Sequence, residues 1–295
     1  MTSPWAALGG EITERSQWYG EFRTRVLEVP GEGPRFVLLH GFADSADTWR
    51  GVLSGLHARG RAATAVDMAG FGVTEPFAPG PLLPQLDSFA DALLASTGPV
   101  VLVGNSLGVA ISLRAAQRNP ALVLGVCALD EPLLSDDWLA RFARGRVAPA
   151  AARVLRRTRM PAPLLRGGIS VFARMALWGD PRAADRALIA LWRDKYGSSA
   201  QVAWLAENAI RFAQESVGGY SGDSVPCPVR IVHGRRDRII PVRAGAALHR
   251  LLPGSEFIVL PRAGHCPQLD DPAGIADLLA DFADRRLGDA SRDVG

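Results

Sequence analysis

Several residue types that would mark a special class of protein are scarce in this sequence. Only three of the 295 residues are cysteines, Cys127, Cys227 and Cys266, and no Cys-x-x-Cys pair occurs. This odd number and wide spacing argue against a disulfide framework and against a zinc site, and they favour a reducing compartment. No apolar run approaches the roughly 20 residues that a membrane-spanning helix needs. The N-terminal residues lack a basic segment followed by an apolar one, so we expect no signal peptide and a cytoplasmic protein.

Lysine is nearly absent, because Lys195 is the only one, and arginine carries almost all of the positive charge. The formal net charge is only +3 and 48% of the residues are hydrophobic, which is typical of a soluble globular protein with a sizeable core. No nucleic-acid-binding motif is present and the aromatic residues do not interleave with the basic ones. We therefore expect no nucleic-acid partner.

Acidic residues are missing from one long stretch. Between Trp138 and Met175 there is no Asp or Glu but there are nine arginines, namely Arg141, Arg144, Arg146, Arg153, Arg156, Arg157, Arg159, Arg166 and Arg174. Two interpretations stay open. The stretch is a solvated face whose arginine stems cover apolar surface, or it attracts an anionic substrate or an anionic lipid surface.

Short apolar runs alternate with amphipathic segments along most of the chain. The runs 35–39, 62–66, 100–103, 122–129, 228–234 and 256–260 read as strands, and 47–59, 85–96, 109–116, 244–252 and 273–284 read as helices, after an expected hairpin at 16–29. This alternation predicts an α/β fold with a mostly parallel central sheet and helices on both faces. From Pro132 to about Gly219 only helical patterns occur. We expect residues 1–131 and 220–295 to form one α/β core, with a helical insertion at 132–219.

The run Val100–Val103 leads into Gly104-Asn105-Ser106-Leu107-Gly108 and then into a helical pattern. A serine on a tight strand-to-helix turn can act as a nucleophile, and small residues two positions before and after it avoid backbone collisions. We therefore predict Ser106 as a nucleophile at the carboxyl end of a central strand. Its base must lie at another strand end.

Two later strands end in residues suited to activate a serine. Asp237 follows the strand at 228–234, and His265 follows the strand at 256–260, giving the chain order Ser, Asp, His. We predict His265 as the general base and Asp237 as the acid that fixes its tautomer. Asp130 also ends a strand and is the competing candidate for the acid, whereas His233 is expected to orient its loop.

Acyl transfer also requires N–H donors for the oxyanion. We predict the backbone N–H of Leu107, directly after the nucleophile, and that of Phe42, after the strand at 35–39. No step of this chemistry needs a cofactor or metal, so none is expected.

The set His40-Gly41-Phe42, Asp67-x-x-Gly70-x-Gly72, Gly104-Asn105-Ser106-Leu107-Gly108, His233-Gly234-x-x-Asp237 and Gly264-His265 resembles the α/β-hydrolase superfamily. The resemblance implies the α/β-hydrolase fold, with the insertion in the position of the family's cap. It also implies a serine hydrolase that cleaves a small-molecule carboxylic ester through an acyl-serine. The arginine-rich stretch leaves open whether this ester is anionic or lipid-like. Family members that open epoxides or remove halide have aspartate at the position of Ser106, which argues against both activities.

Two alternatives remain within the resemblance. The Gly-Asn-Ser-x-Gly form is similar to the carbon–carbon bond hydrolases of meta-cleavage products, although this chain has Leu107, Val109 and Cys266 where those enzymes usually carry Met, Gly and Trp. Some members of the fold have lost catalysis and bind ligands instead. The substrate and the oligomeric state are not determined by the sequence.

Overall fold

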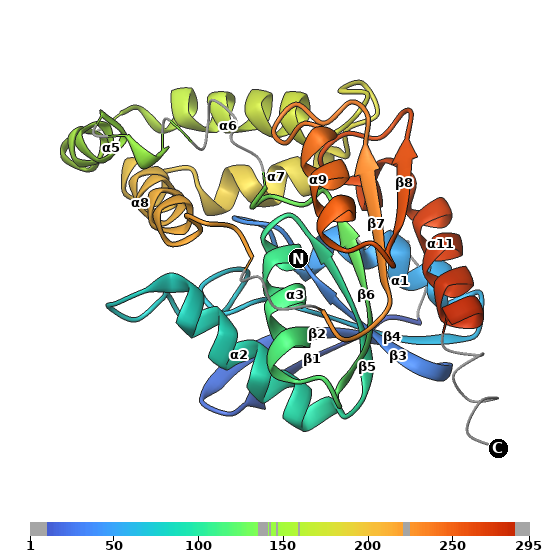
Figure 1. The fold of residues 1–295 in the computed structure, drawn as a ribbon. Coiled ribbons are helices and arrows are strands. Elements are labelled where there is room, and N and C mark those ends of the chain that lie inside the picture. Colours follow the sequence, from blue (N-terminus) through green and yellow to red (C-terminus); the bar gives the residue numbers. More distant parts are fainter. Residues whose placement is uncertain are drawn as a thin grey trace, which may run out of the picture.

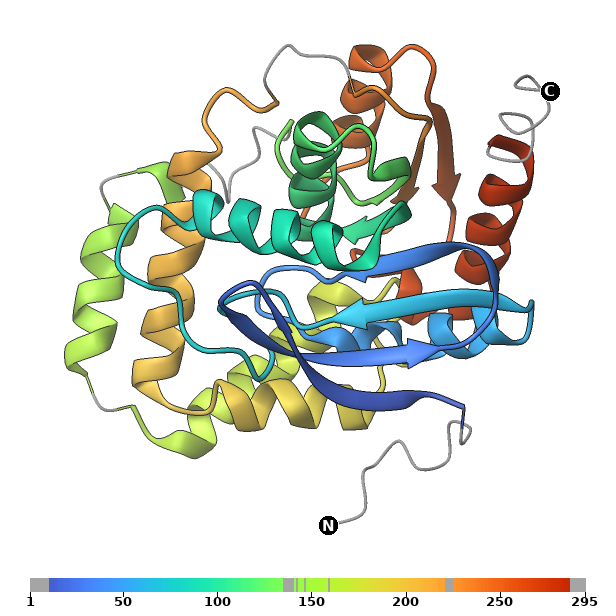
Figure 2. The same ribbon diagram turned by 90° about the horizontal axis from the view of Figure 1, so that it is seen from below.

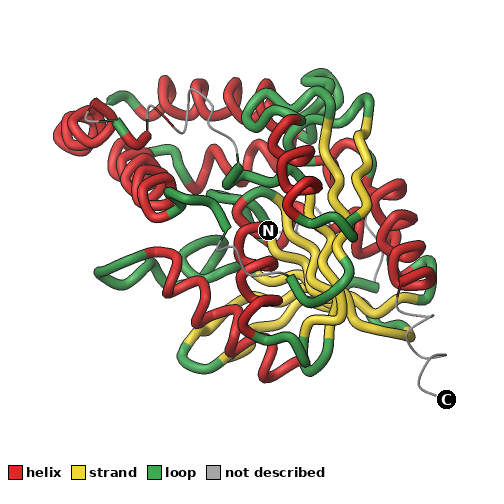
Figure 3. The backbone as a smooth tube through the Cα atoms, in the orientation of Figure 1, coloured by secondary structure: helices red, strands yellow, loops and turns green. Residues whose placement is uncertain are grey.

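The computed structural model describes residues 11–134, 141, 143–145, 147–158, 160–220 and 225–286. Within these residues it contains an eight-stranded sheet in the order β1-β2-β4-β3-β5-β6-β7-β8, drawn in yellow in Figure 3. The strands are β1 (Thr13–Tyr19), β2 (Phe22–Val29), β3 (Glu32–Leu39), β4 (Arg61–Val66), β5 (Val100–Asn105), β6 (Val123–Leu129), β7 (Val229–Gly234) and β8 (Glu256–Leu260). From β4 to β8 all neighbours are parallel, whereas β1 and β2 form an antiparallel hairpin that pairs with β4. Figure 2 shows this hairpin in dark blue at the edge of the sheet.

Helices cover both faces of the sheet, which explains why its central strands are apolar throughout. In β3, Val37 and Leu39 pack into one core while Phe36 and Leu38 pack into the other. The first core is closed by α2 (Leu82–Thr97), α3 (Leu107–Arg118) and α9 (Arg243–Leu251), and the second by α1 (Arg50–His57) and α11 (Pro272–Arg286). A strand buried on both faces has no solvent-facing positions, so it shows a continuous hydrophobic run in the sequence.

Between β6 and β7 the structure describes helices α5 to α8, and Figure 1 shows them beyond the carboxyl ends of the strands. They are α5 (Val147–Arg157), α6 (Ala162–Leu177), α7 (Arg186–Lys195) and α8 (Ser199–Glu215). Helix α5 packs against α8, and α6 packs against α7 around the buried Trp178 and Trp192. The Glu215 carboxylate accepts hydrogen bonds from the Leu82 and Leu83 N–H groups at 2.8 and 2.7 Å, which joins α8 to the N-terminus of α2.

The expected fold class is confirmed by this architecture. All of the expected strands and core helices are present, with boundaries that differ by a few residues. A 3₁₀ turn (Ala46–Trp49) precedes α1. A short helix that the sequence did not predict, α10 (Pro267–Asp270), follows the His265 loop. Part of the predicted insertion, residues 135–140 among them, lies outside the described residues. All three cysteines are unpaired, and among the described residues no helix is both long and apolar enough to cross a membrane.

Candidate active site

Ser106 lies at the junction of β5 and α3, in a strained backbone conformation. Its φ of 52° and ψ of −115° place it in a region that residues with side chains rarely adopt. Such strain costs on the order of 1–3 kcal/mol and persists only where the surrounding structure enforces it. The residue is 8% exposed, and it is the N-cap of α3, whose first N–H groups have no carbonyl partner within the helix. The serine side chain is therefore presented beside free backbone donors.

Glycines on either side make this turn possible. A Cβ added to Gly104 would lie 2.3 Å from the carbonyl of Gly108, and one added to Gly108 would lie 2.2 Å from the Leu39 oxygen. Both contacts are with backbone, which cannot rotate away as a side chain can. The pair thus allows α3 to begin directly against β5 and β3, as the spacing in the sequence indicates.

The loop after β3 passes beside the same serine. A Cβ built on Gly41 would lie 3.5 Å from the Ser106 Cβ, so the backbone of this loop approaches the serine closely. Phe42 follows Gly41, and its ring packs edge-on against Phe71 at 5.1 Å between centroids. Leu107 is the first residue of α3. The two expected oxyanion donors thus belong to segments on either side of Ser106.

His265 and Asp237 are joined directly. The His265 Nδ1 lies 2.8 Å from the Asp237 Oδ2, and both side chains are buried. Burial alone would raise the pKa of Asp237, but the charge and hydrogen bond of His265, with the N–H groups of Ile239 and Ile240, lower it below its usual value. Asp237 is therefore ionised, so in this hydrogen bond the His265 Nδ1 is the donor and the carboxylate is the acceptor.

The Asn105 side chain connects the serine turn to the histidine loop. Its Nδ2 donates to the His265 carbonyl at 2.9 Å, and its Oδ1 accepts from the Gln268 Nε2 at 3.2 Å. In the described part of the chain the Ser106 hydroxyl forms no hydrogen bond with the His265 ring. Such contacts are often long before substrate binds. Asn105, which directly precedes Ser106, thus holds the backbone of His265 beside the serine turn.

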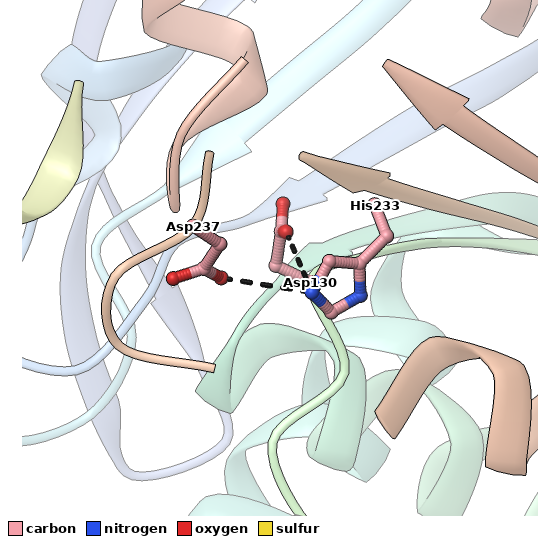
Figure 4. Close-up of side chains that lie close together, drawn as sticks. All are labelled: Asp130, His233 and Asp237. Carbon is pink, nitrogen blue, oxygen red and sulfur yellow. Dashed lines mark ion pairs between the residues drawn. The ribbon is translucent and has the colours of Figure 1, made fainter. Parts of the chain in front are cut away.

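A second buried carboxyl group, Asp130, lies beside Asp237 and His233 in Figure 4. Its Oδ1 accepts from the Gly234 N–H at 2.9 Å and lies 3.3 Å from the His233 Nε2. Burial first, and then the negative charge of Asp237, raise the pKa of Asp130 well above its usual value. Of two neighbouring carboxyl groups, one ionises much more readily than the other. We therefore assign the proton to Asp130 and the charge to Asp237.

The donor set of Asp130, His233 and Asp237 must also be considered as a metal site, since one ligand atom from each lies within 4.8 Å of the others. The His233 Nε2 is 3.0 Å from the Ile240 carbonyl, and Asp237 accepts from His265 and from two backbone N–H groups. Burial lowers the pKa of His233, so its neutral ring donates from Nε2 to Ile240. These hydrogen bonds fix the loop that contains Asp237. They also use the ligand atoms of His233 and Asp237, so we expect no metal here.

The helical insertion contacts each of the three loops. The Cys266 N–H donates to the Leu177 carbonyl at 3.0 Å, directly after His265. Arg238, next to Asp237, donates to the Trp178 carbonyl at 2.8 Å. The Tyr196 hydroxyl donates to the Ala43 carbonyl at 3.0 Å in the loop after β3. These hydrogen bonds attach the insertion to the loops that carry His265, Asp237 and Phe42.

Sequence reasoning missed two residues that organise this site. Asn105 was noted only as part of a motif, although its strand-end position beside the serine was a usable signal. Gln268 had no signal, because its partner Asn105 is 163 positions away in the chain. Such contacts follow from tertiary packing alone.

Known proteins similar to this chain are hydrolases, in sequence and in structure. A family model described as "Alpha/beta hydrolase family" matches residues 36–278. A pimeloyl-[acyl-carrier protein] methyl ester esterase of Methylococcus capsulatus is 30% identical over 274 residues, covering 87% of this chain and 97% of its own. Among solved structures, a bacterial membrane phospholipase A has a TM-score of 0.72 at 19% identity, covering 94% of this chain and 87% of its own. The 2-hydroxy-6-oxo-6-phenylhexa-2,4-dienoate hydrolase of a Rhodococcus strain has a TM-score of 0.69 at 22% identity, covering 92% and 98%.

Proposed function

Because the chain belongs to the alpha/beta hydrolase family, we propose that it hydrolyses a small carboxylic ester through an acyl-serine intermediate on Ser106. The observation that carries the proposal is the bond of 2.8 Å between His265 Nδ1 and the ionised Asp237, beside a serine held in a strained turn. This bond leaves the His265 Nε2 as a base. The name of the Methylococcus relative, a methyl ester esterase, supports an ester as the substrate class.

In the proposed reaction the Ser106 Oγ attacks the ester carbonyl carbon while the His265 Nε2 takes the hydroxyl proton. The negative charge on the carbonyl oxygen is stabilised by the N–H groups of Phe42 and Leu107. When the intermediate collapses, the carbon–oxygen bond to the alcohol breaks and His265 returns the proton to the leaving alcohol. A water molecule then repeats the sequence on the acyl-serine, releasing the acid and the free serine.

The helical insertion serves in this proposal as a cap that selects the substrate. Its support is the set of hydrogen bonds with the three loops of the site, which the Leu177 and Trp178 carbonyls accept and the Tyr196 hydroxyl donates. A cap so placed covers the carboxyl ends of the strands, where ligands bind in open α/β sheets. Acyl length would then depend on side chains of the insertion and not on the triad.

The test uses p-nitrophenyl esters of increasing acyl length with the parent, Ser106→Ala and Ser88→Ala. Losing a triad member typically lowers kcat by about 10⁴-fold. Ser88→Ala is the matched control, because within the described residues this exposed serine of α2 bonds only to the Pro84 carbonyl in the same helix. Ser106→Ala activity within tenfold of the parent would refute the nucleophile assignment.

Two companion assays separate the alternatives. A fluorophosphonate probe should label the parent at Ser106; absence of labelling and turnover would indicate a ligand-binding member of the fold. A meta-cleavage dienoate should be cleaved slowly or not at all. Faster cleavage of the dienoate than of every ester would replace the ester proposal with carbon–carbon bond hydrolysis.

A further inference from the structure

The two outermost helices of the insertion expose apolar side chains to solvent. Figure 1 shows α5 and α6 on the outside, with α8 and α7 between them and the sheet. On α6 the exposed side chains are Leu164, Val171, Phe172 and Met175, each 47–63% exposed. Their spacing of seven, eight and eleven residues places them on one side of the helix, whereas the buried Ala173 lies on the opposite side.

Helix α5 repeats this pattern. Val147 and Val154 are 67% and 61% exposed and lie two turns apart on one side, while Ala148 and Ala152 face α8. We define the outer face as these six apolar residues, Val147, Val154, Leu164, Val171, Phe172 and Met175. Exposed apolar side chains that gather on one side of a helix commonly mark an interaction surface.

All charged residues of α5 and α6 are arginines. Neither α5 nor α6 contains an Asp or Glu, and Arg153, Arg157 and Arg174 are exposed next to the apolar side chains. Arg156 also is exposed, but it pairs with Glu207 of α8 at 3.2 Å and so is partly neutralised. Apolar side chains flanked by arginines give each helix the pattern of an amphipathic helix that lies in a membrane interface.

We propose that the outer face of α5 and α6 binds peripherally to an anionic lipid bilayer. Its six side chains are apolar, and the exposed arginines beside them complement the negative charge of anionic headgroups. A bilayer requires only apolar area that enters the acyl boundary and positive charge that meets the headgroups. The outer face supplies both. This binding goes beyond the proposed ester hydrolysis and does not require Ser106.

The experiment is flotation of the full-length protein with vesicles of phosphatidylcholine alone or mixed with phosphatidylglycerol. The parent and Ser106→Ala should bind the mixed vesicles equally and the neutral vesicles weakly. The triple variant R153Q/R157Q/R174Q should lower partitioning about a hundredfold, because each basic residue near an anionic surface contributes about fivefold. F172S/M175S should lower it by at least about tenfold through lost apolar burial. Turnover of a soluble short ester should be unchanged in both variants.

Matched control variants make the same kinds of substitution at exposed positions outside α5 and α6. W18S/L251S removes two apolar side chains of similar exposure, and R23Q/R250Q/R285Q removes three exposed arginines from other elements. Both should bind mixed vesicles as the parent does. Equal binding to neutral and anionic vesicles, or unchanged binding by the outer-face variants, overturns the proposal. So does failure to bind any vesicle, including the case in which sedimentation shows a dimer that F172S/M175S dissociates.

Discussion

Replacing Asp237 by Asn should nearly abolish turnover, whereas replacing Asp130 by Asn should not. In the parent, Asp237 accepts the His265 Nδ1 proton at 2.8 Å, and its other oxygen accepts from the Ile239 and Ile240 N–H groups. An Asn side chain keeps its oxygen toward those two N–H groups. Its amide nitrogen then faces His265, where a donor meets a donor.

The imidazole resolves this conflict by moving its proton to Nε2. The base toward Ser106 is then lost, and kcat should fall by about 10⁴-fold, equivalent to about 5 kcal/mol of transition-state stabilisation. Asp130 already carries a proton in our assignment, so Asn there changes no charge and keeps an acceptor for the Gly234 N–H at 2.9 Å. At most one neutral hydrogen bond weakens, about 1 kcal/mol or fivefold.

The assay compares kcat for a p-nitrophenyl ester at neutral pH among the parent, Asp237→Asn, Asp130→Asn and the surface control Asp277→Asn, with thermal unfolding to verify the fold. Asp277 is 67% exposed and should have no effect. A larger loss in Asp130→Asn than in Asp237→Asn would mean that the acid follows β6, and the assignment of proton and charge would be wrong.

Two further predictions concern buried residues that support the site. Gly108→Ala places a Cβ 2.2 Å from the Leu39 oxygen, so we expect the unfolding free energy to fall by at least about 2 kcal/mol and activity to be lost. The control Gly168→Ala on α6 adds a Cβ that meets nothing within 4 Å, so its unfolding free energy should rise by about 0.5–1 kcal/mol; equal denaturation midpoints for the two variants would contradict this. Burial lowers the pKa of His40 from 6.5 to about 4, so the unfolded chain binds a proton between these pH values and the folded chain does not, and stability is lost as pH falls through this window. His40→Gln should therefore reduce the drop in unfolding free energy between about pH 7 and pH 4 by up to about 3 kcal/mol, and an unchanged drop would contradict this.

Much of the site could be predicted from the sequence because parallel strands end at one edge of a sheet. Ser106, Asp237 and His265 each follow a short apolar run, so alternation of strands and helices was enough to expect them near one another. The glycines at 104 and 108 indicated the tight turn, since only residues without a side chain fit where α3 starts against β3 and β5. The fold class, the helical insertion and the order of the three residues needed no knowledge of tertiary contacts.

The sequence favoured Asp237 over Asp130 as the acid but could not show the contact itself. Both residues follow apolar strands, so only tertiary structure shows which carboxyl group faces the Nδ1 of His265. In the structure Asp237 accepts hydrogen bonds from a histidine and two backbone N–H groups, while Asp130 is buried beside that charge with a raised pKa, which supports Asp237 as the proposed acid. The link from Asn105 to His265 and Gln268 likewise joins residues 160 or more positions apart. Protonation and orientation are set by neighbours in space, and those neighbours exist only once the sheet has assembled.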